Sequence, residues 1–509
     1  MKLSYPPSLV LVPTVVCALV MAGCGTPTAG EGNGPPPPPP PPPPTNPPPG
    51  GIQVALVYGT YVGGAGFEEG REPIVLPGGR LLFGARTFST TMPTTAGALQ
   101  GSYAGGAADS WLGILNSSGT GFEAATYFGG SGMERPPYGI VVMGNGDIVF
   151  TSATESTNLP TSSGAYRTAL NSPVTGGYVC RVAQSLTTIQ WCTYITGWPR
   201  GGLGLAANED IYVVGFVKPG ATFTATAGAY QTNLRGVDDS FVMRLSSDGA
   251  GTLFRTRLGG SYTGGNGEAA LSVQEHNNRV VVIGITSSFD FPTTPGAPQV
   301  QGAGAYDTYV AHLSPNGTSL TYSTLMGGSG GELTEHGMTI LSDGAVLVAG
   351  ETHSANLPAA IGSLSGSADG FVAKLNGGGT AFEFVRYVGG SGADWLSGPV
   401  VDSQGRIYLV GWTSSTDFPV TAGALQTTYG GGATDAVFVI LSPDARTILY
   451  ATYLGGNGNE LIRGIALDPS GGAYMVGGTS SNNFPVTSGA FQTSRGGDDD
   501  AFALKLSIN

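Results

Sequence analysis

The segment Thr452-Tyr-Leu-Gly-Gly456 decides the fold, because the chain repeats it seven times with small changes. Each copy places a short run of β-favouring residues directly before a pair of turn-forming residues, usually two glycines. The final glycine moves from position 64 to position 456 in six steps, so one unit is about 65 residues long. The other copies are Thr60-Tyr-Val-Gly-Gly64, Thr126-Tyr-Phe-Gly-Gly130, Thr193-Tyr-Ile-Thr-Gly197, Thr256-Arg-Leu-Gly-Gly260, Thr324-Leu-Met-Gly-Gly328 and Arg386-Tyr-Val-Gly-Gly390.

Each unit contains four short apolar runs that are separated by turn residues. In the sixth unit, residues 398–402 precede a Ser-Gln-Gly turn, and residues 406–413 form the next run. A long loop then leads to residues 435–441, and a Ser-Pro-Asp-Ala turn leads to residues 448–454. This pattern predicts antiparallel strands joined by turns and loops.

Seven units of four strands predict an all-β protein, a seven-bladed β-propeller that spans residues 52–509. The first strand pattern, Val54–Tyr61, is that of a fourth strand, whereas the last, Asp500–Leu506, is that of a third strand. We therefore expect the N-terminal strand to complete the last blade and close the ring, which removes the exposed edges of an open array. An open solenoid of the same repeats would need capping units, and the repeat array shows none.

The composition agrees with a turn-rich β protein and excludes several classes of protein. Charged residues make up 11% of the 509 residues, against a usual value of about 25%, and 85 residues are glycine. The formal net charge is −13 with only 21 lysines and arginines, which argues against a phosphate-binding surface. We expect a monomer that binds no nucleic acid.

Residues 446–506 carry the repeat most fully, and this repeat resembles the bacterial SBBP-type β-propeller repeat of lipoproteins. The resemblance extends over roughly residues 52–507. It implies a propeller architecture and a surface location, and it supplies no catalytic residues. The third unit departs most, with Thr196 in place of a glycine and Phe223-Thr224 in place of Phe-Pro, and the fifth lacks the Gly-Ala-x-Gln element. The matching residues are Tyr453, Gly455, Gly456, Asp468, Gly471, Tyr474, Gly478, Thr479, Phe484, Pro485, Gly489, Gln492, Asp500, Phe502 and Lys505.

Residues 1–23 predict a lipoprotein signal peptide. An apolar run at residues 9–22 is short for a membrane span of about 20 residues and fits a secretory signal. It ends in Met21-Ala22-Gly23-Cys24, which resembles a lipobox, and the resemblance implies acylation of Cys24. Because Gly25 and not Asp follows, the same resemblance implies the outer membrane, with the body facing the periplasm or the exterior. The alternative is an ordinary signal peptide followed by an incidental cysteine.

Residues 24–51 predict a stiff linker between that lipid anchor and the propeller. Pro35–Pro44 is an unbroken proline run, which favours an extended polyproline II spacer. The membrane is thus one expected partner, reached through the anchor.

Cys180 and Cys192 flank one predicted hairpin turn nearly symmetrically. Exported proteins fold in an oxidising compartment, so we expect a disulfide between these two residues. Two packed free thiols are the alternative.

A Gly-Gly-x-Gly-x-acid pattern begins five units, and the ring would bring these acids to the channel mouth, on the face that carries the longer loops. Clustered carboxylates there could bind Ca²⁺ or a cationic ligand. Alternatively, each acid caps its own glycine turn by accepting backbone N–H groups. The five acids are Glu68, Glu134, Glu332, Asp394 and Glu460, and Glu268 lies in a shifted version. The aspartates before the third strands invite the same turn-capping interpretation, and they are Asp109, Asp239, Asp307, Asp369, Asp435 and Asp500.

Catalytic motifs are scarce in this sequence. None of the four histidines lies in a His-Glu-x-x-His pattern, and Gly327–Gly331 matches G-x-S-x-G only inside a repeated turn. We expect a non-enzymatic binding, adhesion or envelope-scaffold module that presents its loop-rich face to a protein or glycan. The alternative is an exported polysaccharide hydrolase or lyase that uses the five repeated acids as acid–base groups.

Overall fold

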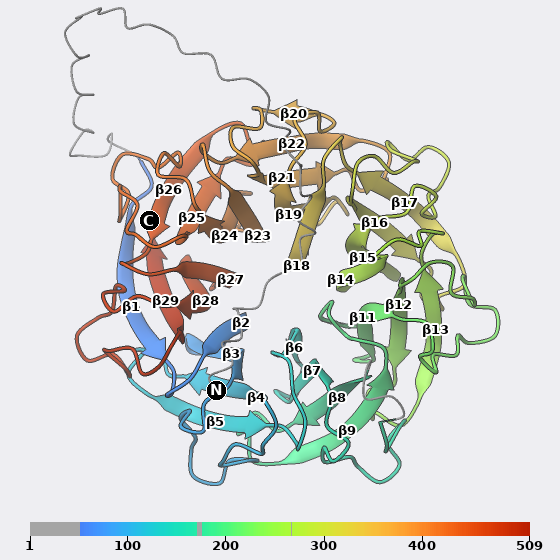
Figure 1. The fold of residues 1–509 in the computed structure, drawn as a ribbon, viewed down its shortest axis with the longest axis horizontal. Coiled ribbons are helices and arrows are strands. Elements are labelled where there is room, and N and C mark those ends of the chain that lie inside the picture. The colour runs from blue at the N-terminus through green and yellow to red at the C-terminus, as the bar shows by residue number, and fades with distance from the viewer. Residues whose placement is uncertain (1–50, 171–175, 266) are drawn as a thin grey trace, which may run out of the picture. The chain divides into compact units, whose positions relative to one another are not determined.

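The computed structural model describes residues 51–170, 176–265 and 267–509, and this part of the chain is all β (Figure 1). Seven sheets stand around a ring, six with four strands and one with five. Within the described ranges, no helix is long and apolar enough to span a membrane. The predicted signal peptide, Cys24 and all but the last residue of the predicted linker lie outside these ranges.

In blades 1 to 6, the four main strands follow one another from the inside outward in chain order, and in blade 5 the short strand β20 adds to the outside of β22. Blades 1 and 2 comprise β2 (Glu68–Leu76), β3 (Arg80–Thr87), β4 (Asp109–Leu115), β5 (Phe122–Phe128), and β6 (Gly139–Val142), β7 (Ile148–Thr154), β8 (Gly176–Val182), β9 (Ile189–Thr196). Blades 3 and 4 comprise β10 (Leu203–Leu205), β11 (Ile211–Val217), β12 (Asp239–Leu245), β13 (Thr252–Leu258), and β14 (Glu268–His276), β15 (Arg279–Thr286), β16 (Asp307–Leu313), β17 (Leu320–Met326). Blades 5 and 6 comprise β18 (Glu332–Ile340), β19 (Val346–Thr352), β20 (Ala360–Ile361), β21 (Asp369–Leu375), β22 (Phe382–Val388), and β23 (Asp394–Val401), β24 (Ile407–Thr413), β25 (Asp435–Leu441), β26 (Ile448–Leu454).

Blade 7 combines the two ends of the ring, as the strand patterns predict. It comprises β27 (Glu460–Leu467), β28 (Gly472–Thr479), β29 (Asp500–Ile508) and, outermost, β1 (Val54–Val62). Strands β1 and β29 pair antiparallel, with Val54 opposite Ile508 and Tyr61 opposite Phe502. The predicted closure is therefore confirmed, and the outer strand of the last blade comes from the other end of the propeller.

The blades hold together through apolar residues that alternate along the middle strands. Phe438 and Ile440 of β25 pack in one cluster with Phe502 and Leu504 of β29, and all four are fully buried. Alternation sends every second side chain to the same face of a sheet, so each blade packs on both neighbours. Each such side chain contributes about 1.5–3 kcal/mol by its burial.

The long loop between the second and third strands of a blade runs along the outer edge of the ring, beside the fourth strand. In blade 1, the N–H of Thr95 donates to the carbonyl of Ala125 on β5 (3.1 Å), and that of Leu99 to Leu186 in the next blade (2.9 Å). The loop therefore pairs with the free edge of the outer strand, which would otherwise invite association with another chain. The sequence predicts that these long loops form a loop-rich face. In the structure, part of each loop covers the outer strand instead, so less of the loop is available to that face.

The tyrosine of the recurring segment anchors the start of the long loop in five blades. In blade 1, the Tyr127 hydroxyl donates to the carbonyl of Ser89 (2.9 Å) and accepts the N–H of Met92 (2.7 Å). Tyr61, Tyr194, Tyr387 and Tyr453 make the same two bonds in their own blades. These tyrosines therefore hold the loops in place from buried positions and do not present a binding surface.

Cys180 and Cys192 lie directly opposite each other on β8 and β9 and form the predicted disulfide. Both are fully buried. We expect the double variant Cys180→Ser, Cys192→Ser to lower the free energy of unfolding by about 3 kcal/mol, because the bridge restricts the unfolded chain. Chemical denaturation measures this loss. Two alkylatable thiols in the unreduced, denatured protein would refute the bridge.

Candidate functional site

The five repeated acids are buried inside the fold and hold their own turns. Both Glu134 oxygens accept bonds, one from the N–H of Gly130 (3.0 Å) and one from the Thr154 hydroxyl (2.6 Å). Glu68, Glu332, Asp394 and Glu460 each accept the equivalent glycine N–H and threonine hydroxyl. All five are 0% exposed. The turn-capping interpretation therefore describes their contacts.

The structure does not bring these acids together at the channel mouth. Each carboxylate is bonded at its own junction between two blades, so the ring separates them. Over the described residues, no three His, Cys, Asp or Glu side chains are grouped so that they could hold a metal ion. The geometry thus offers no shared Ca²⁺ site to Glu68, Glu134, Glu332, Asp394 and Glu460.

Each repeated acid instead meets one aspartate from the third strand of the preceding blade. A Cβ on Gly129 would collide with Asp109 Oδ1 and lie 2.7 Å from Glu134 Oε2, so both carboxylates crowd this glycine. Asp109 Oδ2 accepts bonds from Gln100 Nε2 (3.2 Å) and the N–H of Ala104 (2.7 Å), whereas buried Oδ1 has no donor. Two carboxylates that face each other this closely repel when both are ionised, which favours a proton on one of them. We call these pairs acid dyads, and they are Asp500–Glu68, Asp109–Glu134, Asp239–Glu268, Asp307–Glu332, Asp369–Asp394 and Asp435–Glu460.

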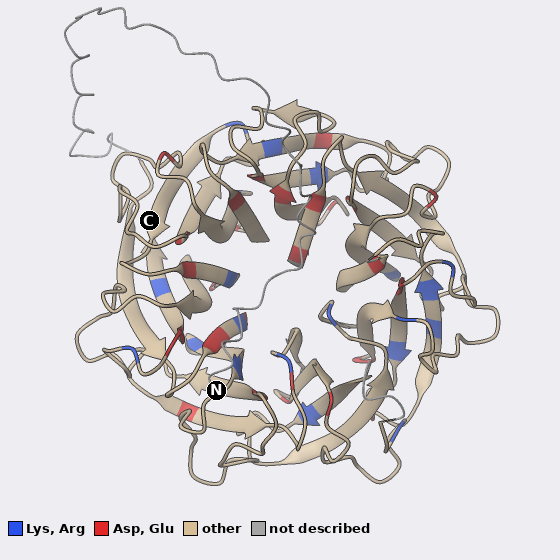
Figure 2. Cartoon of the chain, in the orientation of Figure 1, with Lys and Arg blue, Asp and Glu red and all other residues tan. Residues whose placement is uncertain are grey.

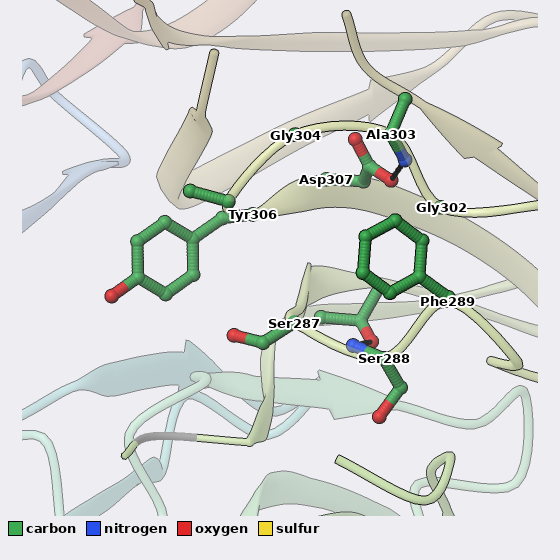
Figure 3. Close-up of a pocket in the computed structure, with 10 residues that line it drawn as sticks. Ser287, Ser288, Phe289, Gly302, Ala303, Gly304, Tyr306 and Asp307 are labelled. Carbon is green, nitrogen blue, oxygen red and sulfur yellow. Dashed lines mark hydrogen bonds between the residues drawn. The ribbon is translucent and has the colours of Figure 1, made fainter. Parts of the chain in front are cut away.

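The electrostatics of the acid dyads follow from this burial. Burial raises the pKa of Glu134 to about 7 and the pKa of Asp109 to about 6. Burial likewise raises the pKa of Glu268 and of Asp307 to about 7. Figure 3 shows the Asp307 carboxylate turned into its own loop, where the N–H of Ala303 donates to it (2.6 Å).

One junction, between blades 2 and 3, lacks both members of the dyad. Gly176 begins β8 where the other blades have an aspartate, and Gly197 is followed by Trp-Pro-Arg-Gly, without an acid at the fourth position. The junction that lacks the aspartate therefore also lacks its partner acid.

The ring centre carries charges that the repeat does not predict. They lie one or three residues after the repeated acid on the inner strands, and Figure 2 shows charged residues at the inner ends of several blades. Arg463 of blade 7 pairs with Glu69 of blade 1 (2.7 Å) and with Glu335 of blade 5 (2.9 Å). Arg200 of blade 3 also approaches Glu335 (3.5 Å). Ion pairs therefore tie four blades together across the centre.

This central network fixes the charge of its acids. Burial opposes ionisation of Glu69, but the arginines beside it, Arg71 and Arg463 foremost, hold its pKa well below the usual range. A carboxylate in that state is a poor proton donor or acceptor near neutral pH.

A family model described as a β-propeller repeat, SBBP, matches residues 383–419 and 449–485. The chain contains SBBP repeats. Each matched stretch covers an outer strand, the glycine turn, the repeated acid and the first two strands of the following blade. The matched stretches therefore include Asp394 and Glu460, which accept the glycine N–H and threonine hydroxyl bonds described above. No curated protein sequence matches the chain.

Solved structures with a similar fold are distant. A protein of unknown function from Dyadobacter fermentans is 13% identical, with 90% of this chain and 99% of that chain covered and a TM-score of 0.42. BamB from Moraxella catarrhalis is 9% identical, with 89% and 99% covered and a TM-score of 0.41. The polysaccharide lyase Uly1 is 6% identical, with 90% and 98% covered and a TM-score of 0.40. At these values, no activity carries over to this chain.

A cavity of about 550 Å³ opens between blades 5 and 6, beside the tight turns. It arises where Leu347 occupies the place of Tyr408 and Tyr474 in the next two SBBP repeats. Two of its charged residues are in ion pairs, Lys374 with Glu383 (2.9 Å) and Asp402 with Arg406 (2.5 Å), and Asp343 accepts the N–H of Ala345 (2.9 Å). The cavity therefore presents mainly apolar and hydroxyl-bearing walls.

Sequence reasoning singled out the residues that repeat and missed those that break the repeat. Tyr262 stands where five other blade junctions have a glycine that donates its N–H to a loop serine, as the N–H of Tyr262 also does. Phe289 and Tyr306 likewise replace small or polar residues of the other blades. Aligning the seven units against one another would have exposed these departures.

Proposed function

We propose that this protein is an exported, lipid-anchored binding module that performs no catalysis. One observation carries the proposal. The repeated polar residues are buried and hydrogen-bonded within the fold, whereas side chains that break the repeat are exposed and could contact a ligand. The six acid dyads are buried at the blade junctions. A rigid ring with covered edges suits the presentation of a fixed binding surface.

The alternative, a polysaccharide hydrolase or lyase, needs accessible acids with adjusted pKa values. The five acids that would serve it are fully buried. The central acids Glu69 and Glu335 are held by arginines. The contacts therefore favour binding over cleavage.

The test applies a panel of soluble glycans and envelope proteins to the full chain and measures both retention and bond cleavage. We expect retention of at least one ligand without new reducing ends or unsaturated products. Cleavage that disappears in a folded Glu335→Gln variant would overturn the proposal, because Glu335 is a central acid with partial exposure (14%).

The proposed anchor gives a separate prediction. We expect Cys24→Ser to abolish incorporation of labelled palmitate and to release the protein from the outer-membrane fraction, because the thiol is the acylation point. Fractionation of labelled cells measures both effects. Continued labelling of the variant would contradict a lipid anchor at Cys24.

A further inference from the structure

Blade 4 gathers aromatic side chains at positions where its sister blades have small or polar residues. Phe289 is 63% exposed and occupies the place of Thr90, Thr157, Ala355, Thr416 and Asn482 in the equivalent loops. Tyr306 precedes the dyad aspartate, where the other blades with a dyad have alanine, threonine or aspartate. Tyr262, 36% exposed, replaces a turn glycine. We call these three residues the aromatic trio.

The aromatic trio lies around one shallow depression of the surface. Phe289 and Tyr306 line it together, and Figure 3 shows their rings on opposite sides of it. Tyr262 lies beside it, because the Tyr262 N–H donates to the hydroxyl of Ser288 (3.0 Å), which lines the depression. Three departures from the repeat therefore meet at one place, although they lie in separate segments of the chain.

The floor between the rings is built largely from main chain. Residues 302–305 read Gly-Ala-Gly-Ala and are half-buried or exposed, so no side chain larger than a methyl group stands there. Small residues let a ligand approach the peptide groups closely. The depression is not an enclosed cavity, which suits an extended chain lying across it better than a small molecule held inside.

The depression carries little net charge. Its one charged lining residue is Asp307, which is 2% exposed and bonded within the loop. At its rim, Arg235 and Asp290 neutralise each other in an ion pair (3.0 Å). An anionic or cationic ligand thus finds no unbalanced partner among the described residues of the depression.

The N–H groups of Gly302, Ala303 and Ala305 already donate within the protein. We propose that the aromatic trio binds a neutral polysaccharide, whose sugar rings lie against Phe289 and Tyr306 and whose hydroxyls donate to main-chain carbonyls of Gly302–Ala305. The negative faces of aromatic rings attract the C–H groups of a sugar, and rigid aromatic side chains lose little entropy on binding. This inference rests on the proposed function, since it names the ligand class of that binding module.

The test measures retardation of the full chain in native gels that contain laminarin or hydroxyethylcellulose, two neutral glycans, or polygalacturonate, an acidic one. We expect a neutral glycan to retard the protein and the double variant Phe289→Ala, Tyr306→Ala to bind about tenfold more weakly, as loss of two aromatic contacts implies. Retention should not change between about 0.05 and about 0.5 M salt, because no charges pair.

Phe491→Ala is the matched control, because Phe491 is 36% exposed but lies in the edge-covering loop of blade 7. It should bind as the wild type does. The trio would not be a neutral-glycan site if the protein were retained only by polygalacturonate or only by envelope proteins. The same conclusion would follow if the wild type and the double variant were retained equally. None of these results would contradict the proposed binding module. Cleavage of the glycan would instead contradict the proposed function.

Discussion

Glu134→Ala should lower the free energy of unfolding by about 3 kcal/mol, a large effect for one residue. The variant leaves the N–H of Gly130 and the Thr154 hydroxyl without their buried acceptor, and it opens a void beside Asp109. Each unsatisfied buried group costs about 1–3 kcal/mol. Denaturant unfolding monitored by tryptophan fluorescence measures the loss.

Glu155→Ala is the control for this prediction, because Glu155 lies in the same blade with its side chain 53% exposed. Its ion pair with Arg135 at 4.0 Å is long and exposed, so the variant should stay within about 0.5 kcal/mol of the wild type. If the two variants lowered the free energy of unfolding equally, the repeated acid would not be an important source of stability.

Stability should also fall as the pH rises from about 5 to about 8. The pKa values of about 6 for Asp109 and about 7 for Glu134 lie above the ordinary 3.8 and 4.5. Such groups stabilise the fold fully below their unfolded pKa, and this contribution is lost as the pH passes the folded pKa. Asp402 and Asp468 have lowered pKa values, so their stabilising contribution is lost only at a pH below about 5 and does not change between about pH 5 and about pH 8. We expect a loss on the order of 1 kcal/mol for each acid dyad.

Asp109→Asn separates the acid dyad from other causes of pH dependence. The amide N–H takes the place of the shared proton, while the amide oxygen can still accept from Gln100 and Ala104. We expect this variant to be about 1 kcal/mol more stable than wild type at pH 8 and to show a shallower pH profile. Asp444→Asn, whose parent side chain is 62% exposed, should leave the profile unchanged. Lower stability of Asp109→Asn at pH 8 would rule out a shared proton.

Much of the fold is predictable from the sequence, because it rests on a pattern that occurs seven times. The phase of that pattern at Val54 and Asp500 is enough to predict closure through β1 and β29. The path of the long loops is not predictable this way, because it depends on bonds such as Thr95 to Ala125 between segments that show no shared periodicity.

The candidate site was harder to predict, for a physical reason. Repetition marks the acids Glu134 and Asp109 separately, but their contact depends on how one blade packs on the next. The aromatic trio carries no repeat at all, and its members come together only in the folded ring. Sequence periodicity thus reports what the blades share, whereas the proposed binding residues are those that one blade does not share.

Tyr306 and Asp435 are expected to have opposite roles. Tyr306 lines the depression, whereas Asp435 belongs to an acid dyad of blade 6 and accepts the N–H of Gly430 (2.6 Å). The deciding measurement is the affinity for the retained neutral glycan of Tyr306→Ala and Asp435→Ala, at a temperature where circular dichroism shows both folded. We predict weaker binding by Tyr306→Ala at wild-type stability, and wild-type binding by Asp435→Ala at reduced stability. Loss of binding in Asp435→Ala with unchanged binding in Tyr306→Ala would contradict the division between residues that build the ring and residues that bind.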